Sequence, residues 1–140
     1  MTDLQLNAAQ ITEYLAEVFP QMTDKIIIED IAPMEASVRY VVGQSDLRPG
    51  DTVSGPAMFT LADCAYYVAT LAMVGRQALT VTTSATINFM RKPTPGDLIG
   101  KARILKLGRS LSVGDVMVYS QGVAEPVAHA SLTYSIPPKR

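Results

Sequence analysis

Asp63 is the residue of this chain whose type and surroundings most clearly suggest chemistry. Between Asp51 and Arg76 it is the sole formally charged side chain, and it lies in an apolar run from Ser54 to Gly75. A carboxylate in such surroundings must be desolvated, solvated by a cleft or paired with a partner, and each condition shifts its pKa from that of a surface aspartate. Perturbed carboxylates occur at functional sites and also at purely structural positions. The pattern therefore predicts that Asp63 belongs to an active site or is bonded across a subunit interface.

Two other residue types could supply nucleophilic or metal chemistry, but neither has the surroundings that it needs. Cys64 follows Asp63 directly, yet a cysteine nucleophile requires a nearby base, and His129 is the sole histidine of the chain. We therefore expect Cys64 to be a small buried core residue and His129 to lie on the solvated face of a strand. No group of Cys, His, Asp and Glu residues has the spacing of metal ligands, so no metal site is expected.

The residues around Asp63 are expected to form one long helix. Ser54 is a suitable N-cap, Pro56 falls in the first turn, where its missing N–H costs nothing, and Gly75 ends the helix. One line of residues at helical spacing is entirely apolar, whereas a second line contains polar groups. We expect the first line to pack on a sheet and the second to face a cleft or another subunit. The first line is Met58, Leu61, Ala65, Val68 and Ala72, and the second is Thr60, Asp63, Tyr67 and Thr70.

The remaining sequence predicts a short helix and an antiparallel sheet. Asn7 and Gln10 have the spacing of a capping box, and apolar residues then recur at helical spacing as far as Pro20. Stretches of β-branched and alternating residues predict strands, with turns where Gly, Pro, Asp and Ser gather. No crossover helices recur between these strands, which makes a doubly wound parallel sheet a poor fit. The expected strands are 26–31, 37–42, 79–89, 98–107, 111–120 and 127–136, with a loop at 44–53.

Two of these strands alternate clearly, which assigns their side chains to opposite faces. In the strand after the long helix, Thr82 falls among the polar residues of one face and Val81 among the apolar residues of the other. In the last strand, Tyr134 belongs to the apolar face and His129 to the polar face.

Composition limits the classes of function. With 140 residues, 48% of them hydrophobic, the chain is long enough for a single domain, which we place at residues 1–140. A formal net charge of −1 without a basic run argues against a nucleic-acid partner, and the start of the chain lacks the pattern of a secretory signal, so we expect a cytoplasmic protein.

The apolar run is long enough to suggest a membrane span, but Asp63 near its centre favours a buried helix instead. Because that helix is apolar on nearly all sides, a single sheet cannot cover it, and we expect a homodimer or a homotetramer.

Several motifs together resemble one family of enzymes. The stretch Ser54-Gly-Pro-Ala-Met-Phe-Thr-Leu-Ala-Asp63 is similar to the His-Gly-Gly...Leu-Ala-Asp start of the long helix in the phenylacetate-degradation-type (PaaI-like) acyl-CoA thioesterases. Similar stretches follow at Val81–Pro93, Pro95–Asp97 and Lys106–Leu111, and the resemblance extends from about Asp46 to the C-terminus. It implies an α+β hotdog fold, in which a curved antiparallel sheet wraps one long central helix after a short N-terminal helix, and dimers pair their sheets edge to edge.

The resemblance also implies roles for individual residues. In the family the helix carboxylate acts as general base or nucleophile at the thioester, and Asp63 stands at that position. The backbone N–H of the glycine at the helix start, here Gly55, is expected to bind the thioester oxygen. A hydroxyl on the strand after the helix orients the attacking water; Thr82 matches this position best, and Thr83 is the alternative.

The chain departs from the family pattern in two places. Ser54-Gly55-Pro56 replaces the usual His-Gly-Gly, and Arg48 replaces an upstream Asn that polarises the carbonyl in many members. Ser54 can still donate a hydrogen bond, and Pro56 removes an amide that the helix start can spare. Two hypotheses follow: an acyl-CoA thioesterase that releases a carboxylic acid and free coenzyme A, or a non-catalytic protein that binds acyl-CoA or another hydrophobic ligand. A hotdog dehydratase or hydratase fits less well, because the helix region lacks the expected catalytic His.

Further residues are candidates for substrate binding. Tyr67 shares the Asp63 face of the helix and could line the acyl pocket. Basic residues that flank turns either serve solubility or neutralise the phosphates of coenzyme A. No cofactor is expected, since coenzyme A is part of the substrate. The candidate binding residues are Arg48, Ser54, Tyr67, Thr83, Arg91, Lys106 and Arg109.

Overall fold

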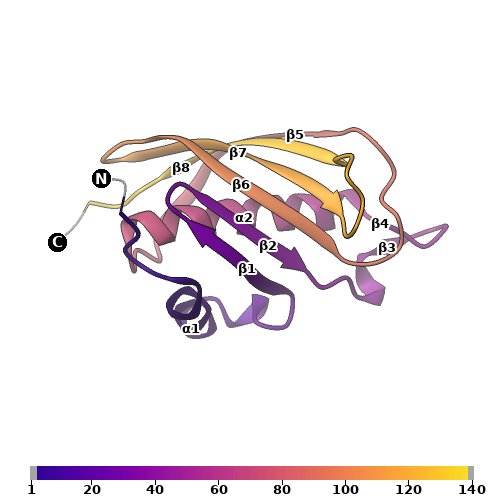
Figure 1. The fold of residues 1–140 in the computed structure, drawn as a ribbon, viewed down its shortest axis with the longest axis horizontal. Helices are drawn as coiled ribbons and strands as arrows, with labels where there is room; N and C mark the ends of the chain where they lie inside the picture. Colours follow the sequence, from indigo (N-terminus) through magenta and orange to yellow (C-terminus); the bar gives the residue numbers. More distant parts are fainter. Residues whose placement is uncertain (1–2, 139–140) are drawn as a thin grey trace.

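A curved antiparallel sheet wraps around one long helix, α2 (Figure 1). In the computed structural model, which describes residues 3–138, the larger sheet has six strands in the order β1-β2-β6-β7-β8-β5. Because β1 and β5 have no further neighbour in this sheet, they form its two edges. The elements are α1 (Ala8–Val18), β1 (Ile26–Ala32), β2 (Glu35–Tyr40), β3 (Leu47–Arg48), β4 (Thr52–Val53), α2 (Gly55–Val74), β5 (Val81–Phe89), β6 (Leu98–Leu107), β7 (Leu111–Ser120) and β8 (Ala128–Ser135).

Helix α2 begins and ends where the sequence predicts. The Ser54 hydroxyl oxygen accepts a hydrogen bond from the Ala57 N–H at 3.3 Å, and Pro56 lies in the first turn. Gly75 ends the helix with a φ of 90°, a conformation that glycine adopts without strain, and its N–H donates to the Leu71 carbonyl at 2.8 Å.

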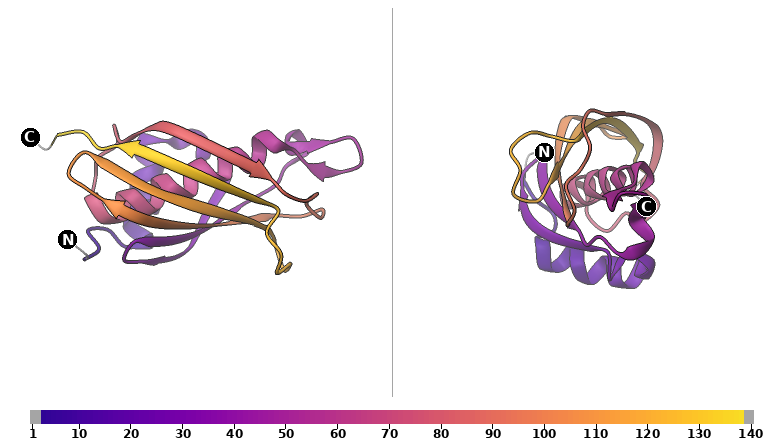
Figure 2. Two further views of the ribbon diagram at one scale, coloured as in Figure 1. Left: turned by 90° about the horizontal axis from the view of Figure 1, so that it is seen from above. Right: turned by 90° about the vertical axis from the view of Figure 1, so that its right-hand side faces the viewer.

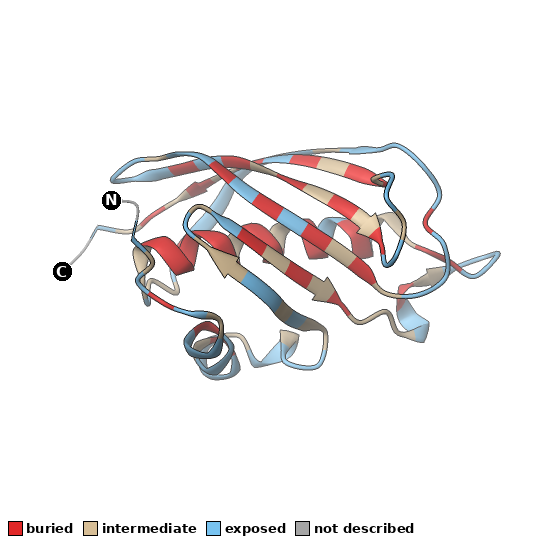
Figure 3. Cartoon of the chain, viewed as in Figure 1, coloured by how far each residue is buried: buried red, intermediate tan, exposed pale blue. Residues whose placement is uncertain are grey.

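The sheet covers most of α2, as the end-on view of Figure 2 shows. The predicted apolar line from Met58 to Ala72 is buried, and bands of buried residues alternate with exposed ones along the strands that pack on it (Figure 3). Within residues 3–138, α2 is the one helix that is long and apolar enough to cross a membrane by length and composition, and 72% of its most apolar window is buried inside the fold. Burial against the sheet therefore accounts for its apolar composition.

The expectation for Thr70 is wrong. Helical spacing groups this residue with Asp63 and Tyr67 on the face toward a cleft, but it is fully buried, and its hydroxyl lies 3.1 Å from the Ser112 hydroxyl of β7. The Tyr66 hydroxyl lies 2.8 Å from the same Ser112 oxygen. The sheet thus covers the C-terminal half of α2 more completely than the N-terminal half, and the polar groups there pair with one another.

The N-terminal helix forms as the sequence predicts. Asn7 and Gln10 make the reciprocal capping box, with distances of 2.8 and 2.9 Å. Ile11 and Leu15 on α1 join the core against the rest of the fold. The helix lies beside β1 and contacts α2, so it brings its C-terminal end close to the uncovered side of α2.

The segment expected as a loop at 44–53 contains regular structure instead. A 3-10 turn, Gln44–Asp46, precedes the short antiparallel pair β3 and β4. Buried Asp46 anchors this segment, because its carboxylate accepts hydrogen bonds from the Tyr40 hydroxyl at 2.8 Å, the Gly43 N–H at 2.8 Å and the Lys25 ammonium at 3.0 Å. Its carbonyl accepts from the Ser54 N–H at 2.8 Å, so the same residue fixes the start of α2.

Burial acts to raise the pKa of the Asp46 carboxyl, but the Gly43 N–H, the Lys25 ammonium and the Tyr40 hydroxyl outweigh it and hold the pKa below its ordinary value. Asp46 is therefore a structural carboxylate that stabilises the folded state while it is ionised.

Candidate active site

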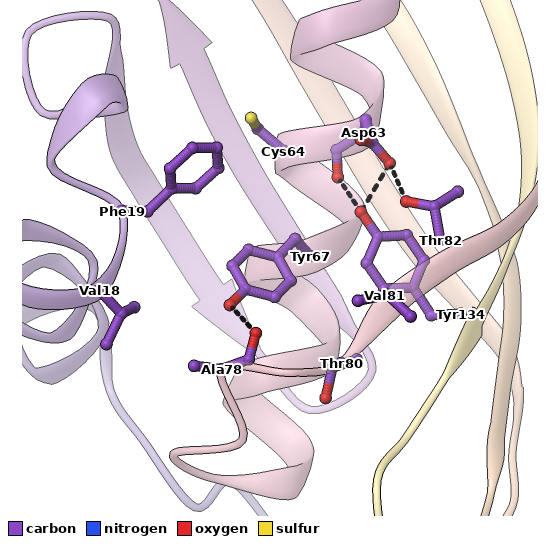
Figure 4. Close-up of a pocket in the computed structure, with 10 residues that line it drawn as sticks. All are labelled: Val18, Phe19, Asp63, Cys64, Tyr67, Ala78, Thr80, Val81, Thr82 and Tyr134. Atoms are coloured by element: carbon purple, nitrogen blue, oxygen red, sulfur yellow. Dashed lines mark hydrogen bonds between the residues drawn. The ribbon is translucent and has the colours of Figure 1, made fainter.

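Asp63 lies in an open pocket of about 410 Å³ beside the uncovered side of α2 (Figure 4). Four parts of the chain form its wall: the middle of α2, the end of α1, the start of β5 with the segment before it, and the end of β8. The half-buried Asp63 side chain is thus both held by the protein and reachable from solvent. The lining residues are Val18, Phe19, Asp63, Cys64, Tyr67, Ala78, Thr80, Val81, Thr82 and Tyr134.

Two hydroxyl groups hold one oxygen of the Asp63 carboxylate. The Thr82 hydroxyl donates to Oδ1 at 2.7 Å, and the Tyr134 hydroxyl lies 2.6 Å from the same oxygen. The Tyr134 hydroxyl also lies 2.8 Å from the Asp63 carbonyl, so its single proton is shared between two acceptors. Within residues 3–138, no group donates a hydrogen bond to Oδ2. The carboxylate therefore has one oxygen that is fixed and one that is available for chemistry.

A β-bulge in β5 turns Thr82 toward Asp63. Thr82 lies opposite Tyr134 on β8, but Ser84 lies opposite Thr133, so the register shifts at Thr83. Residues directly opposite each other in an antiparallel pair share a face, and Tyr134 is on the buried face that meets α2. Thr82 is consequently on the helix side of the sheet, and such bulges commonly re-aim a side chain next to a functional site.

The bulge corrects the face assignment made from the alternating pattern. That pattern places Thr82 with the polar residues of the strand and Val81 with its apolar residues, whereas in the structure Thr82 lies on the helix side and Val81 pairs with Ser135 on the outer face. The reason is that the bulge adds one residue to the strand, so every residue before it points to the opposite face from the one that strict alternation predicts. The Thr83 hydroxyl donates to the Thr133 carbonyl at 3.2 Å, so of the two candidates it is Thr82 that contacts Asp63.

Burial keeps the other titratable groups beside Asp63 neutral. It raises the pKa of the Cys64 thiol to about 12, and the Asp63 charge adds to this shift. It also raises the pKa of Tyr67 to about 12, and the Tyr67 hydroxyl donates to the Ala78 carbonyl at 2.9 Å. Cys64 is buried, as predicted, and its protonated thiol is a poor nucleophile.

Aromatic side chains form one wall of the pocket. The rings of Tyr67 and Tyr134 stack with centroids 6.1 Å apart, and Phe19 meets Tyr67 edge-on at 6.5 Å. Tyr67 therefore lines the pocket, where its ring can contact an apolar group that enters toward Asp63.

Gly55 lies in a different pocket. It shares an open site of about 420 Å³ with Arg48 and Arg91, and this site does not include Asp63. Asp63 follows Gly55 by eight positions, which correspond to about 12 Å along the helix axis. One chain therefore cannot bring the Gly55 N–H and the Asp63 carboxylate to the same carbonyl group.

The start of α2 offers one free backbone donor. Pro56 has no N–H, and the Ala57 N–H donates to the Ser54 hydroxyl oxygen. Within the described residues, the Gly55 N–H has no intramolecular acceptor. Ser54 thus acts first as the helix cap, and its own hydroxyl proton remains available to a ligand.

Two candidate cations lie far from Gly55. Lys106 is exposed near the end of β6, and Arg109 lies in the turn before β7, in a pocket of about 780 Å³ that also includes Val74 and Pro137. Val74 is the last residue of α2 and Gly55 the first, so the predicted binding residues are distributed over both ends of the helix.

His129 lies on the outer face of the sheet, as predicted, and it has a partner there. Its Nε2 is 3.0 Å from the Asp115 carboxylate, which also binds the Arg103 guanidinium in a bidentate pair at 3.0 and 3.1 Å. Burial acts to raise the pKa of Asp115, but these two partners outweigh it and lower the pKa. Among residues 3–138, no three His, Cys, Asp or Glu side chains lie close enough to hold a metal ion.

Sequence reasoning missed Tyr134 as part of this site. The alternating pattern placed it on the buried face of the last strand, and a buried tyrosine hydroxyl needs a hydrogen-bond partner. Asp63 is the charged residue of the helix that this face meets. Taken together, these two observations predict a contact between Tyr134 and Asp63.

The sequence and the fold together define the class of protein. Residues 50–127, more than half of the chain, match the family model of the thioesterase superfamily. The chain belongs to this superfamily, and it has the hotdog fold. A search of curated proteins finds no match.

Solved structures agree with this assignment. A protein from Silicibacter sp. TM1040, described as a candidate thioesterase, is 50% identical over 98% of this chain and 96% of that chain, with a TM-score of 0.91. A mutant of the phenylacetic acid degradation protein PaaI from Thermus thermophilus is 26% identical over 84% of this chain and 99% of that chain, with a TM-score of 0.72. The E. coli PaaI protein shares the fold at 23% identity, with 93% of each chain covered and a TM-score of 0.79.

Proposed function

We propose that this protein is an acyl-CoA thioesterase that hydrolyses a thioester to a carboxylic acid and free coenzyme A. The observation that carries the proposal is the Asp63 carboxylate, which lies in a pocket of a thioesterase-superfamily fold with Oδ1 held and Oδ2 free. Asp63 acts either as the general base or as the nucleophile.

In the general-base route, Asp63 Oδ2 accepts a proton from a water molecule as the water oxygen bonds to the thioester carbon. The carbonyl oxygen becomes an oxyanion, which a backbone N–H stabilises. The carbon–sulfur bond then breaks, and the thiolate of coenzyme A leaves and takes up a proton. In the nucleophilic route, Oδ2 itself bonds to the carbon, the thiolate leaves, and water hydrolyses the resulting anhydride. The proton of the Thr82 hydroxyl is engaged by Asp63, so Thr82 can orient a water molecule only by accepting a hydrogen bond from it.

The proposed catalytic unit is a homodimer. Because Gly55 and Asp63 of one chain are about 12 Å apart along α2, the oxyanion donor for one Asp63 must come from the Gly55 N–H of a second copy. An apolar surface suits such a contact, since Val81 is 52% exposed, Phe89 53% and Leu79 77%, all on or beside the edge strand β5. The unpaired edge of β5 offers backbone groups for the same contact, and two such dimers can associate as a tetramer.

Cationic residues around these pockets support coenzyme A as the thiol part of the substrate. Arg48 and Arg91 line the pocket that contains Gly55, and Arg109 lines the pocket at the other end of α2. Phosphate groups of coenzyme A are stabilised by such side chains, whereas the acyl group enters the pocket lined by Tyr67 and Phe19.

The test is release of free thiol from a panel of acyl-CoAs with aromatic, medium-chain and branched acyl groups. The proposal expects turnover of at least one substrate by the wild-type protein. Because the helix start offers a single N–H and Arg48 replaces the family Asn, a protein that only binds acyl-CoA is the second candidate. Calorimetric binding of an acyl-CoA without thiol release from any member of the panel would support that candidate and refute the first.

A further inference from the structure

We propose that Tyr134 is a positioning residue that, with Thr82, fixes Asp63 Oδ1 and so makes Oδ2 the reacting oxygen. This inference rests on the proposed function, because it assigns a role within the same site. It follows from the two hydroxyl groups that converge on one carboxylate oxygen at 2.6 and 2.7 Å while the other oxygen has no donor among the described residues.

The two donors lie side by side in the sheet. Tyr134 and Thr82 lie directly opposite each other on β8 and β5, and the bulge at Thr83 places them on the same face. The Tyr134 ring is buried and packs between Tyr66, at a centroid distance of 5.4 Å, and Tyr67, at 6.1 Å. A carboxylate held by groups with fixed positions keeps one orientation, which is what a reacting oxygen requires.

The Tyr134 hydroxyl keeps its proton at neutral pH. Burial, with the negative charge of Asp63 second, raises the pKa of Tyr134 far above its ordinary value. The proton of the phenol is shared between Oδ1 and the Asp63 carbonyl. Its donation to the carboxylate stabilises one orientation of the Asp63 side chain, so loss of the donor leaves Oδ1 less fixed.

Few other groups can titrate beside Asp63. From α2 the pocket contains Cys64 and Tyr67, both of which burial keeps neutral, and from β8 it contains Tyr134. The lining residues at the end of α1 and in β5, such as Val18, Phe19 and Thr82, carry no titratable side chain. The groups that surround Asp63 therefore do not change their charge near neutral pH.

The experiment compares Tyr134→Phe with Tyr66→Phe. The control removes a hydroxyl that bonds to Ser112 from a neighbouring buried ring and leaves the Asp63 contacts in place. We expect Tyr134→Phe to lower kcat about tenfold with little change in KM, the scale of one hydrogen bond to a charged group, whereas Tyr66→Phe should keep the kcat of the wild type. An unchanged kcat in Tyr134→Phe would overturn the inference, as would an equal loss of kcat in Tyr66→Phe.

A second readout needs no turnover. In protein labelled with ¹³C at the aspartate carboxyl groups, the Asp63 signal is identified by its loss in Asp63→Asn and recorded at neutral pH without substrate. We expect its chemical shift to change in Tyr134→Phe and also in Thr82→Val, which removes the other donor, but not in Thr82→Ser, which keeps it. An unchanged Asp63 signal in both donor variants would overturn the positioning role. A changed signal in a protein that hydrolyses no acyl-CoA would instead refute only the proposed function.

Discussion

A subunit complementation experiment tests whether each active site uses Gly55 of one chain and Asp63 of another. Gly55 is the first residue of α2, where proline fits the backbone, so Gly55→Pro removes the N–H without breaking the helix. Asp63→Asn removes the reacting oxygen. Each variant alone should lose about 10² in kcat or more, the scale of a lost oxyanion donor or general base.

The geometry of the shared site determines how much activity a mixture of the two variants recovers. When the two variants are co-expressed in equal amounts, about half of the dimers contain one chain of each kind. If each site combines Gly55 of one chain with Asp63 of the other, each mixed dimer has one intact site and one site with both defects. The mixture should therefore show about a quarter of the wild-type thiol release, against about 1% for either variant alone.

Gly55→Ala is the matched control for this experiment. It adds a Cβ that lies 3.3 Å from the Phe89 ring but keeps the N–H, so it should retain most of the activity if the N–H is what matters. Light scattering on the same samples must show a dimer or tetramer. A co-expressed mixture with no more activity than the two single variants would refute the shared site, and so would a stable monomer at micromolar concentration.

Two further predictions concern charge. Replacing both Lys106 and Arg109 by Ala should raise KM for acyl-CoA at low ionic strength, and the difference should shrink at high salt because phosphate attraction is screened; an unchanged KM at low salt would mark them as ordinary surface charges. Asp46→Asn should lower the free energy of unfolding at pH 7 by about 1–3 kcal/mol, since it weakens hydrogen bonds to an ionised group. Because the pKa of Asp46 is lowered in the folded state, this contribution is complete above the ordinary value of 3.8 and is lost as the pH falls through the folded value. Denaturant titrations at pH 7 and pH 3 should thus show a smaller difference between wild type and variant at the lower pH, and an equal difference would contradict the assignment.

The sequence predicts much of the fold because its signals are local. The Asn7 capping box, the Ser54 cap and Gly75 each act within one turn of a helix, and they place the start of α1 and both ends of α2 correctly. The six strands of the main sheet also follow from short-range alternation and turn residues.

Features that depend on contacts between distant segments are harder to predict. The bulge at Thr83 adds one residue to β5, and only the pairing with β8 reveals it, so alternation alone turns Thr82 the wrong way. Asp46 looks like an ordinary loop residue until the ammonium of Lys25, 21 residues earlier in the chain, and the hydroxyl of Tyr40 reach its carboxylate. Asp63 itself is recognisable from the sequence, because its charge is isolated in an apolar helix. The structure adds that Gly55 and Asp63 lie in different pockets, so that one chain cannot bring them to the same carbonyl group.

The kinetics of Asp63→Asn test the central claim most directly. The amide keeps an oxygen at the Oδ1 position, which can still accept from Thr82 and Tyr134, and it replaces Oδ2 by an amino group, so the variant should fold like the wild type. Asp24→Asn, which alters an exposed carboxyl group, serves as the control. The account predicts that thiol release from acyl-CoA falls by about 10² or more in Asp63→Asn while acyl-CoA still binds and Asp24→Asn stays active. Wild-type turnover by Asp63→Asn would show that the chemistry does not depend on this carboxylate.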